Sequence, residues 1–207
     1  MKVSLVSVTP KAEENIVYIA RVSSKREDKK SKPEGLLNYL IKHKHWSPFE
    51  HSYMSVEIET SKAIGIQLIR HRSFTFQEFS QRYQDVSLLG EEMFEEIEFR
   101  KQCEDNRQSS TETHDSAGAE AKLILLQIQR LYKGLLEDGV ARETARMILP
   151  LCTKTKIHMT GSIRSWVHFL ELRDDEHAQK EIQLIAKEVK RIFVEEFPII
   201  SKALKYD

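Results

Sequence analysis

Residues 53–69 read YMSVEIETSKAIGIQLI and place a strand pattern directly before a helix pattern. From Tyr53 to Thr60 apolar and polar side chains alternate and β-branched residues recur, as in a half-buried β-strand. Ser61 is a residue type that caps helices, and apolar side chains then gather between Ile64 and Ile69. A strand that leads at once into a helix favours a fold that mixes α and β structure.

The rest of the chain contains more helix patterns than strand patterns. Residues 3–8 alternate like another strand, and helical stretches follow from Pro10 to Ala20 and from Pro33 to the basic run His43-Lys44-His45. Seven glycines and five prolines are too few for a sandwich of many short strands and tight turns. Further helices are predicted over residues 121–136, 141–150, 162–172 and 176–197, with a candidate strand at 156–160.

Residues 91–120 depart from these periodic patterns. The stretch is polar, and its least structured part runs from Asp105 to Glu112. Because core-forming patterns resume on both sides of it, we expect a surface excursion rather than a linker between domains. The chain is therefore predicted to form a single α+β domain over residues 1–207, rich in helices, with a small antiparallel or mixed sheet.

The charges of the chain balance, with 32 Lys and Arg residues against 32 Asp and Glu residues. This balance excludes the broad positive surface of a protein that coats nucleic acid or an anionic membrane, so any anion site must be local. No apolar run approaches the roughly 20 residues that span a bilayer, and the N-terminus lacks a signal-peptide pattern. We therefore expect an intracellular, cytoplasmic protein in which Cys103 and Cys152 are free thiols.

The densest chemistry lies between Arg70 and Tyr83, in the sequence RHRSFTFQEFSQRY. Three arginines, a histidine, hydroxyls and amides share this segment with a single carboxylate. Guanidinium and hydroxyl donors suit phosphate and planar carbonyl groups, so the segment fits an anionic, heteroaromatic ligand. The alternative is a solvated basic helix end whose arginines favour the helix dipole.

At this segment the sequence resembles the flavin-dependent thymidylate synthases. Their signature is Arg-His-Arg, two residues, Ser or Thr, one residue, Asn or Gln, Glu, one residue, Ser, one residue and Arg, and residues 70–82 fill every fixed place. Other family elements follow the same order along the chain. The matching blocks are SPFEH at 47–51, ARMILP at 145–150, and RSWVHFLELR at 164–173 with HAQKEI at 177–182.

The resemblance implies a function and an assembly. Members of the family convert dUMP to dTMP, with methylenetetrahydrofolate as the carbon donor and NADPH as the reductant of FAD. They are homotetramers whose active sites are shared between subunits, and they use no cysteine nucleophile. Cys103 and Cys152 lie outside every matched nucleotide position, which agrees with this last point.

The resemblance also implies which residues contact dUMP. Ser80, Gln81 and Arg82 are expected near the phosphate, and Arg146 is expected to reach dUMP from another subunit. Arg173 is the expected catalytic residue, because a guanidinium beside the uracil ring stabilises the negative charge that develops there. The full predicted set is Gln67, Leu68, Ile69, Arg70, Glu78, Phe79, Ser80, Gln81, Arg82, Arg146 and Arg173.

A second set of positions matches the family's FAD contacts. Ser162 stands where the family usually has Asn, so an amide contact there is lost or replaced by a hydroxyl. Tyr53 is bulkier than the small residues expected at its place, whereas His168 keeps a hydrogen-bonding group. The full predicted set is His51, Tyr53, Arg70, His71, Arg72, Glu78, Ser162, Arg164 and His168.

Two other functions fit parts of the sequence. A nucleic-acid-binding module could use the arginines and phenylalanines of residues 70–82 for charge and stacking, but the zero net charge counts against it. His43, His45 and His51 with Glu50 resemble the ligands of a zinc hydrolase, but no second ligand cluster accompanies them. We therefore predict no metal site and no nucleic-acid or membrane partner.

Overall fold

A four-stranded antiparallel sheet forms the centre of the computed structural model, which describes residues 1–22, 32–90, 92–107, 109–114 and 118–206. The strand order is β1-β2-β6-β3. The longest pairing joins β2 to β6, from Tyr53 opposite Ser162 to Ser61 opposite Lys154. The small sheet expected from the sequence is therefore antiparallel. Its strands are β1 (Lys2–Val8), β2 (Tyr53–Ser61), β3 (Thr75–Glu78) and β6 (Lys154–Ser162).

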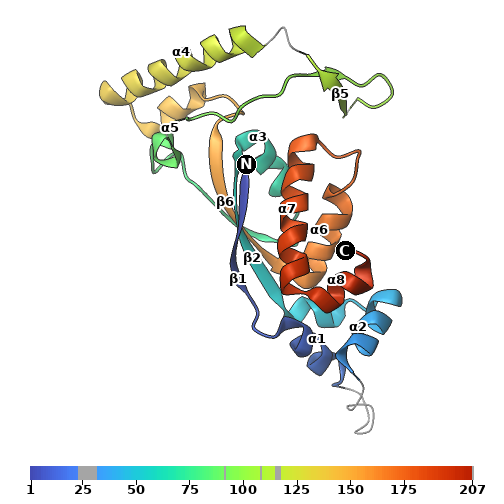
Figure 1. Ribbon diagram of the computed structural model, residues 1–207. Helices are drawn as coiled ribbons and strands as arrows, with labels where there is room; N and C mark the ends of the chain where they lie inside the picture. The colour runs from blue at the N-terminus through green and yellow to red at the C-terminus, as the bar shows by residue number, and fades with distance from the viewer. Residues whose placement is uncertain (23–31, 91, 108, 115–117, 207) are drawn as a thin grey trace.

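Three helices cover one face of this sheet, as Figure 1 shows. They are α3 (Lys62–Leu68), α6 (Ile163–Arg173) and α7 (Lys180–Glu196). Burial alternates along β6, where Ile157 and Met159 are inaccessible and pack in one core with Trp166 of α6 and Phe193 of α7. This alternation arises because successive side chains of a strand point to opposite faces.

The remaining helices of the main body gather at one end of the sheet (Figure 1). They are α1 (Ala12–Ala20), α2 (Pro33–Lys42), the short 3₁₀ helix η2 (Ser47–His51) and α8 (Pro198–Leu204). The expected helix over 176–197 is corrected at its start, which lies at Lys180, whereas its end agrees to within one residue. The helix α8 that follows was not predicted from the sequence. A turn around Asp175 precedes α7, and Pro198 begins a new helix, because proline disfavours helical backbone in the residue before it.

The opposite end of the molecule carries an extension, which we call the arm, built from residues 86–148 (Figure 1). A small core of Val86, Met93, Tyr132 and Ala145 holds it together. The stretch 91–120 is not without structure, because it contains a hairpin of β4 and β5. The predicted helix over 141–150 is two short pieces, α5 and η5. The arm consists of η3 (Val86–Leu89), β4 (Arg100–Gln102), β5 (Ser110–Thr113), α4 (Gly118–Glu137), α5 (Arg142–Ala145) and η5 (Arg146–Ile148).

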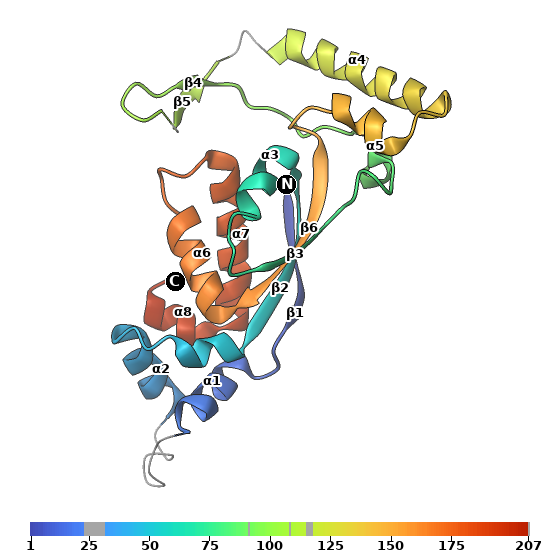
Figure 2. The ribbon, with the colours of Figure 1, turned by 180° about the vertical axis from the view of Figure 1, so that it is seen from behind.

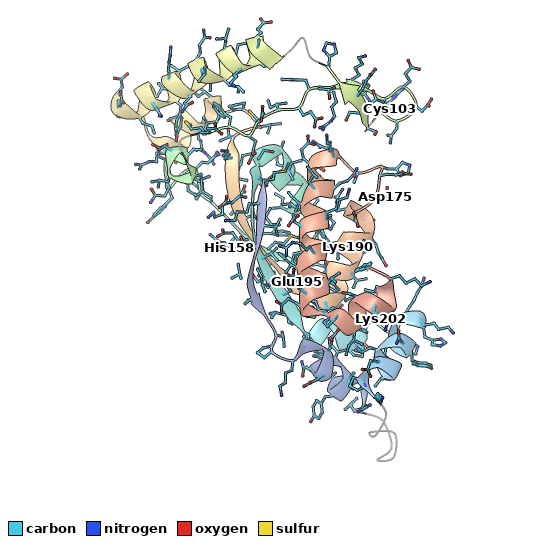
Figure 3. The ribbon with its side chains drawn as sticks, viewed as in Figure 1. Cys103, His158, Asp175, Lys190, Glu195 and Lys202 are labelled. Carbon is cyan, nitrogen blue, oxygen red and sulfur yellow. The ribbon has the colours of Figure 1, made fainter. Side chains whose placement is uncertain are left out.

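The face of the sheet away from the helices is polar. Lys156 of β6 lies 3.1 Å from both Glu57 and Glu59 of β2, and these contacts raise its pKa. Figure 3 places His158 on this face, on the other side of the sheet from Lys190 of α7. Among the helices that the structure describes, none combines the length and apolar character needed to cross a membrane.

β3 was not predicted from the sequence. It pairs with β6 from Thr75 opposite Thr160 to Glu78 opposite Ile157, and Figure 2 shows it beside β6. Four residues are too few to show a clear alternating pattern, so the strand exists because β6 offers an edge to pair with. The second half of the 70–82 segment is thereby fixed to the sheet.

Candidate functional site

The turn between α3 and β3 alternates exposed and buried side chains. Arg70 and Arg72 are exposed, whereas His71 between them is 9% exposed. The backbone N–H of His71 donates to the Leu68 carbonyl at 3.0 Å, and the Phe74 N–H donates to the His71 carbonyl at 3.1 Å. These bonds form a tight turn that presents the two guanidinium groups to solvent on either side of a buried imidazole.

Phe74 anchors this turn to the body of the protein. Its ring lies 4.7 Å from the ring of Trp166, and it covers Gly161 so closely that a Cβ there would lie 2.4 Å from the ring. Real Cβ atoms do not approach other atoms so closely, so only glycine fits opposite Phe74. The packing holds Arg70 and Arg72 at defined positions on the surface.

His71 joins this turn to the end of α6. The Nε–H of Arg173 donates to Nε2 of His71 at 2.9 Å, across 102 residues of sequence. Burial and the positive charge of Arg173, with a smaller effect of His168, lower the pKa of His71 from 6.5 to about 4. The imidazole is therefore neutral at pH 7, as an acceptor from a guanidinium must be.

Two arginines of the turn carry uncompensated charge. Within the described residues, neither Arg70 nor Arg72 has a carboxylate within ion-pair distance, whereas Arg82 lies 3.6 Å from Glu143 of α5. Both Arg82 and Glu143 are mostly exposed, so their pairing is weak. Guanidinium groups without a carboxylate partner among the described residues make this surface suited to an anion, despite the zero net charge of the chain.

The predicted phosphate segment contains a donor without a partner. Gln81 is 7% exposed, and its Nε2 has no hydrogen-bond partner among the described residues. Leaving a buried amide donor unmet is costly, so the position suits a ligand that accepts a hydrogen bond. Ser80 beside it is exposed, and the two residues lie just past the end of β3.

Glu78 is used differently from its neighbours. Its carboxylate accepts hydrogen bonds from Nζ of Lys62 and Oγ1 of Thr155, both at 2.8 Å, so it ties β3 to α3 and β6. Phe79 donates its backbone N–H to the Lys156 carbonyl at 2.8 Å. In this arrangement both residues hold the segment on the sheet.

A second group of predicted residues surrounds the N-terminus of α6. Ser162 caps the helix by accepting from the Ser165 N–H, and its own hydroxyl donates to Glu50 at 2.6 Å. Arg164 donates to the other oxygen of Glu50 at 2.9 Å. The Ser162 side chain is thus buried and committed to protein partners. His51 and Tyr53 are exposed nearby, and His168 is exposed one turn along α6 from Arg164.

Gln67 lies in the last turn of α3 and is joined to the arm by a chain of hydrogen bonds. Its amide donates to Gln179 at 2.6 Å, Gln179 donates to Glu181, and Glu181 accepts a two-pronged contact from Arg100 of the hairpin at 2.6 and 2.9 Å. Leu68 is fully buried, so a ligand could meet only its backbone, whereas Ile69 is half exposed. The hydrogen-bond chain connects a predicted nucleotide residue to the arm.

The structure therefore divides the predicted site residues into three groups. In the first group His71 contacts Arg173, and in the second the Ser52 carbonyl accepts from the N–H of Ile163 at the start of α6. In the third, Arg82 pairs with Glu143 of α5, which leads to Arg146. Glu50, Glu143 and Gln179 were not predicted as site residues. Glu50 and Gln179 stand inside the SPFEH and HAQKEI blocks, which is the signal that could have identified them.

Two of the histidines considered for a metal site, His43 and His45, lie apart from these groups. The His43 and His45 rings are 6.1 Å apart, and both pack against Tyr39 at the end of α2. Within the described ranges, no three His, Cys, Asp or Glu side chains are grouped so that they could hold a metal ion.

Fold and site together define a small α+β protein with a group of exposed arginines whose donors suit an anionic ligand. Comparison with known proteins identifies the family to which a protein of this class belongs. The family model described as thymidylate synthase complementing protein matches residues 4–199. The chain belongs to this family, the flavin-dependent thymidylate synthases.

Individual relatives match over most of their length. A probable flavin-dependent thymidylate synthase of Paramecium bursaria Chlorella virus 1 is 44% identical over 219 aligned positions, covering 100% of both chains. The flavin-dependent thymidylate synthase of Synechocystis is 39% identical, covering 92% of this chain and 88% of its own. Among solved structures, the UMP/dUMP methylase PolB of Streptomyces cacaoi, bound with 5-Br dUMP, superposes with a TM-score of 0.84 at 28% identity, covering 99% of this chain and 94% of its own.

Proposed function

We propose that this protein catalyses the reductive methylation of dUMP to dTMP, with methylenetetrahydrofolate as the carbon donor and NADPH as the reductant of a bound FAD. The observation that carries the proposal is the contact of Arg173 with the turn that presents Arg70 and Arg72, which have no carboxylate partner in the described part of the chain. The names of the relatives, and the nucleotide analogue in PolB, support the same chemistry.

The nucleotide phosphate is proposed to bind at residues 80–82. Gln81 offers an unmet buried amide, Ser80 an exposed hydroxyl, and Arg82 a guanidinium whose present partner Glu143 is exposed and weakly held. A phosphate dianion is a stronger partner for Arg82 than an exposed carboxylate, because it offers more charge and more acceptor oxygens. Gln67 to Arg70, Glu78 and Phe79 complete the proposed dUMP site of the chain, and Arg146 would extend toward dUMP bound at another subunit.

Arg173 is proposed to activate the pyrimidine. Its guanidinium is half-buried, and burial lowers its pKa, yet it remains ionised at neutral pH. A fixed positive charge beside a uracil carbonyl and ring nitrogen stabilises the anionic form of the ring, which is the form that attacks an electrophilic carbon. No thiol is required, and burial raises the pKa of Cys152, which keeps that sulfur protonated and poorly nucleophilic.

Some residues of the predicted FAD set have exposed side chains that suit FAD, and others have side chains engaged with the protein. Arg70 and Arg72 offer unpaired charge for a pyrophosphate, and Arg164, His168 and His51 are exposed near one another around α6 and η2. Ser162 and Glu78 have side chains engaged with the protein, so they would support the site rather than bind the flavin directly. When bound, FAD supplies the hydride-carrying chemistry that the arginines and histidines only position.

We also propose that the protein is a homotetramer with active sites shared between subunits. The arm leaves large apolar side chains of α4 exposed, including Leu123 at 63% and Leu131 at 55%. Apolar surface of this kind is usually covered by another chain, and a second copy is the partner that the resemblance indicates. A cytoplasmic location belongs to this proposal as well, and the two free thiols agree with it.

Anaerobic single turnover tests the proposed function. Purified protein carrying FAD is reduced with NADPH, then mixed with methylenetetrahydrofolate and either dUMP or UMP. Formation of dTMP from dUMP is expected, and UMP in place of dUMP shows whether the ribose 2′-hydroxyl is tolerated. Absence of dTMP from protein that demonstrably holds FAD would overturn the proposal. Salt-dependent binding of an oligonucleotide by colourless protein would instead favour the nucleic-acid-binding alternative.

A further inference from the structure

Arg173 uses only one of its edges in the contact with His71. The guanidinium has five N–H donors, of which Nε–H points to Nε2 of His71 at 2.9 Å. The two terminal amino groups remain for other partners. The next residue, Asp174, pairs with Lys190 of α7 at 2.9 Å, so the backbone that carries Arg173 is also held.

His71 is built into the protein as an acceptor. Its ring is packed edge-on against Phe169 at a centroid distance of 5.0 Å and against Phe74 at 6.2 Å. The charged and titratable groups that act on it, Arg173 and His168, both belong to α6 and both disfavour a second proton on the ring. With Nε2 accepting from Arg173, the ring proton lies on Nδ1.

We propose that His71 is a positioning residue, which accepts the Nε–H of Arg173 and thereby turns the two terminal amino groups of the guanidinium toward the uracil ring. This role rests on the proposed function of Arg173. An arginine held at one edge presents a planar fork on the other, which suits a carbonyl oxygen and the adjacent ring nitrogen. Without the acceptor, the long side chain has several rotamers available and loses its alignment.

Two substitutions of similar size separate the acceptor role from simple packing. His71→Gln places an amide oxygen near the position of Nε2, whereas His71→Met fills the same space without an acceptor. With rates expressed per bound FAD, His71→Met is expected to lose about 10²-fold in kcat, and His71→Gln is expected to lose about tenfold less than His71→Met because it restores the acceptor. Equal loss in both variants, or no loss in His71→Met, would overturn the proposal. If wild-type protein makes no dTMP, the proposed function fails instead.

A second measurement does not depend on activity. In protein labelled with ¹⁵N at histidine, NMR is expected to show His71 as the Nδ1–H tautomer at pH 7. Arg173→Gln should raise the pH at which His71 titrates, because it removes the positive charge beside the ring. A titration of His71 that Arg173→Gln leaves unchanged, or an Nε2–H tautomer in wild-type protein, would contradict the contact. This result also decides the matter if His71→Met does not fold.

Discussion

At the scale of the residue, the neighbours Arg70, His71 and Arg72 differ in burial and therefore in chemistry. Arg70 and Arg72 are exposed to water, while burial and the neighbouring Arg173 guanidinium lower the pKa of His71 to about 4. The same three residue types on an exposed helix end would all be solvated. The chemistry of the segment therefore depends on Phe74, which fixes the turn to the core.

Arg173→Ala is expected to retain FAD and quaternary structure but to lose about 10²- to 10³-fold in kcat, because the charge beside the uracil ring disappears. Turnover of dUMP, flavin absorbance and light scattering measure the three properties. Normal turnover in this variant would contradict the role assigned to Arg173.

Arg82→Ala is expected to weaken dUMP binding about 10- to 100-fold, since a charge-assisted hydrogen bond to phosphate contributes about 1.5–3 kcal/mol. Its matched control is Arg191→Ala, because Arg191 lies on α7 and pairs only with Glu188 and Glu195 among the described residues. Titration of each variant with dUMP measures the dissociation constant. Equal affinity in the Arg82 and Arg191 variants would argue against a phosphate contact at Arg82.

The pKa of His71 also predicts how stability depends on pH. Between pH 6.5 and about 4 the unfolded chain protonates this histidine and the folded protein does not, so acid favours unfolding. This effect of His71 on the free energy of unfolding is absent above pH 6.5 and grows as the pH falls. Near pH 4 it lowers the free energy of unfolding by an amount on the order of 3 kcal/mol. Urea unfolding of wild-type and His71→Gln protein at several pH values isolates it, because glutamine does not titrate. Parallel curves for the two proteins would contradict the shift.

At the scale of the element, β6 shows how one strand serves both fold and site. Its inward residues Ile157 and Met159 build the core, its edge pairs with β3, and Gly161 receives the ring of Phe74. α6 then starts at its N-cap Ser162 and ends at Arg173. The helix thus places Arg164 and His168, proposed for FAD, and Arg173, proposed for dUMP, on the stretch of chain that continues directly from β6.

Gly161→Ala is expected to destabilise the protein by about 1–3 kcal/mol, because the added Cβ meets the Phe74 ring and forces a shift. FAD affinity should fall with it, since the ring anchors the turn of Arg70 and Arg72. Gly134→Ala is the control: a Cβ there meets nothing within 4 Å, and alanine is the better helix former. Urea unfolding compares the two, and equal stability in both variants would show that the Phe74 contact is not tight.

At the scale of the whole molecule, the arm distinguishes this protein from a compact sheet covered by helices (Figure 1). Its small core buries only Tyr132 of the twenty residues of α4. The hairpin is tied to α7 mainly by charged contacts, with Arg100 to Glu181 and Lys180 to Glu98. Burial raises the pKa of Glu181, but the hydrogen bonds led by Arg100 outweigh it, so the pKa lies below its ordinary value. An arm with so much exposed apolar surface fits the proposed assembly of several copies.

Leu131→Lys is expected to shift the tetramer toward smaller species, because it places a charge in apolar surface that a second copy would cover. Lys133→Ala, a change at another exposed position of α4, should leave the assembly intact. Sedimentation velocity distinguishes the outcomes. An unchanged sedimentation coefficient for Leu131→Lys would remove α4 from the proposed interface.

The amino-acid sequence alone determined α1, α2, α3, α6 and α7 of the main body, three strands of the central sheet and the blocks that carry the family resemblance. These depend on local properties: the spacing of apolar residues, the caps at Ser61 and Ser162, and the residue types of the 70–82 segment. The helix after Pro198 was missed and the helix pieces between 142 and 148 were predicted as one, because such short elements are decided by a few backbone contacts.

Only the tertiary structure decided which of these residues act together. The strand Thr75–Glu78 forms because β6 offers an edge, and Arg173 meets His71 because α6 packs beside the turn that follows α3. Burial by distant segments makes His71 an acceptor, leaves Gln81 Nε2 without a partner among the residues that the structure describes, and engages Ser162 with Glu50. Such contacts join residues far apart in the chain. Their free energies depend on how completely the folded protein excludes water around them, and a local sequence pattern does not encode this.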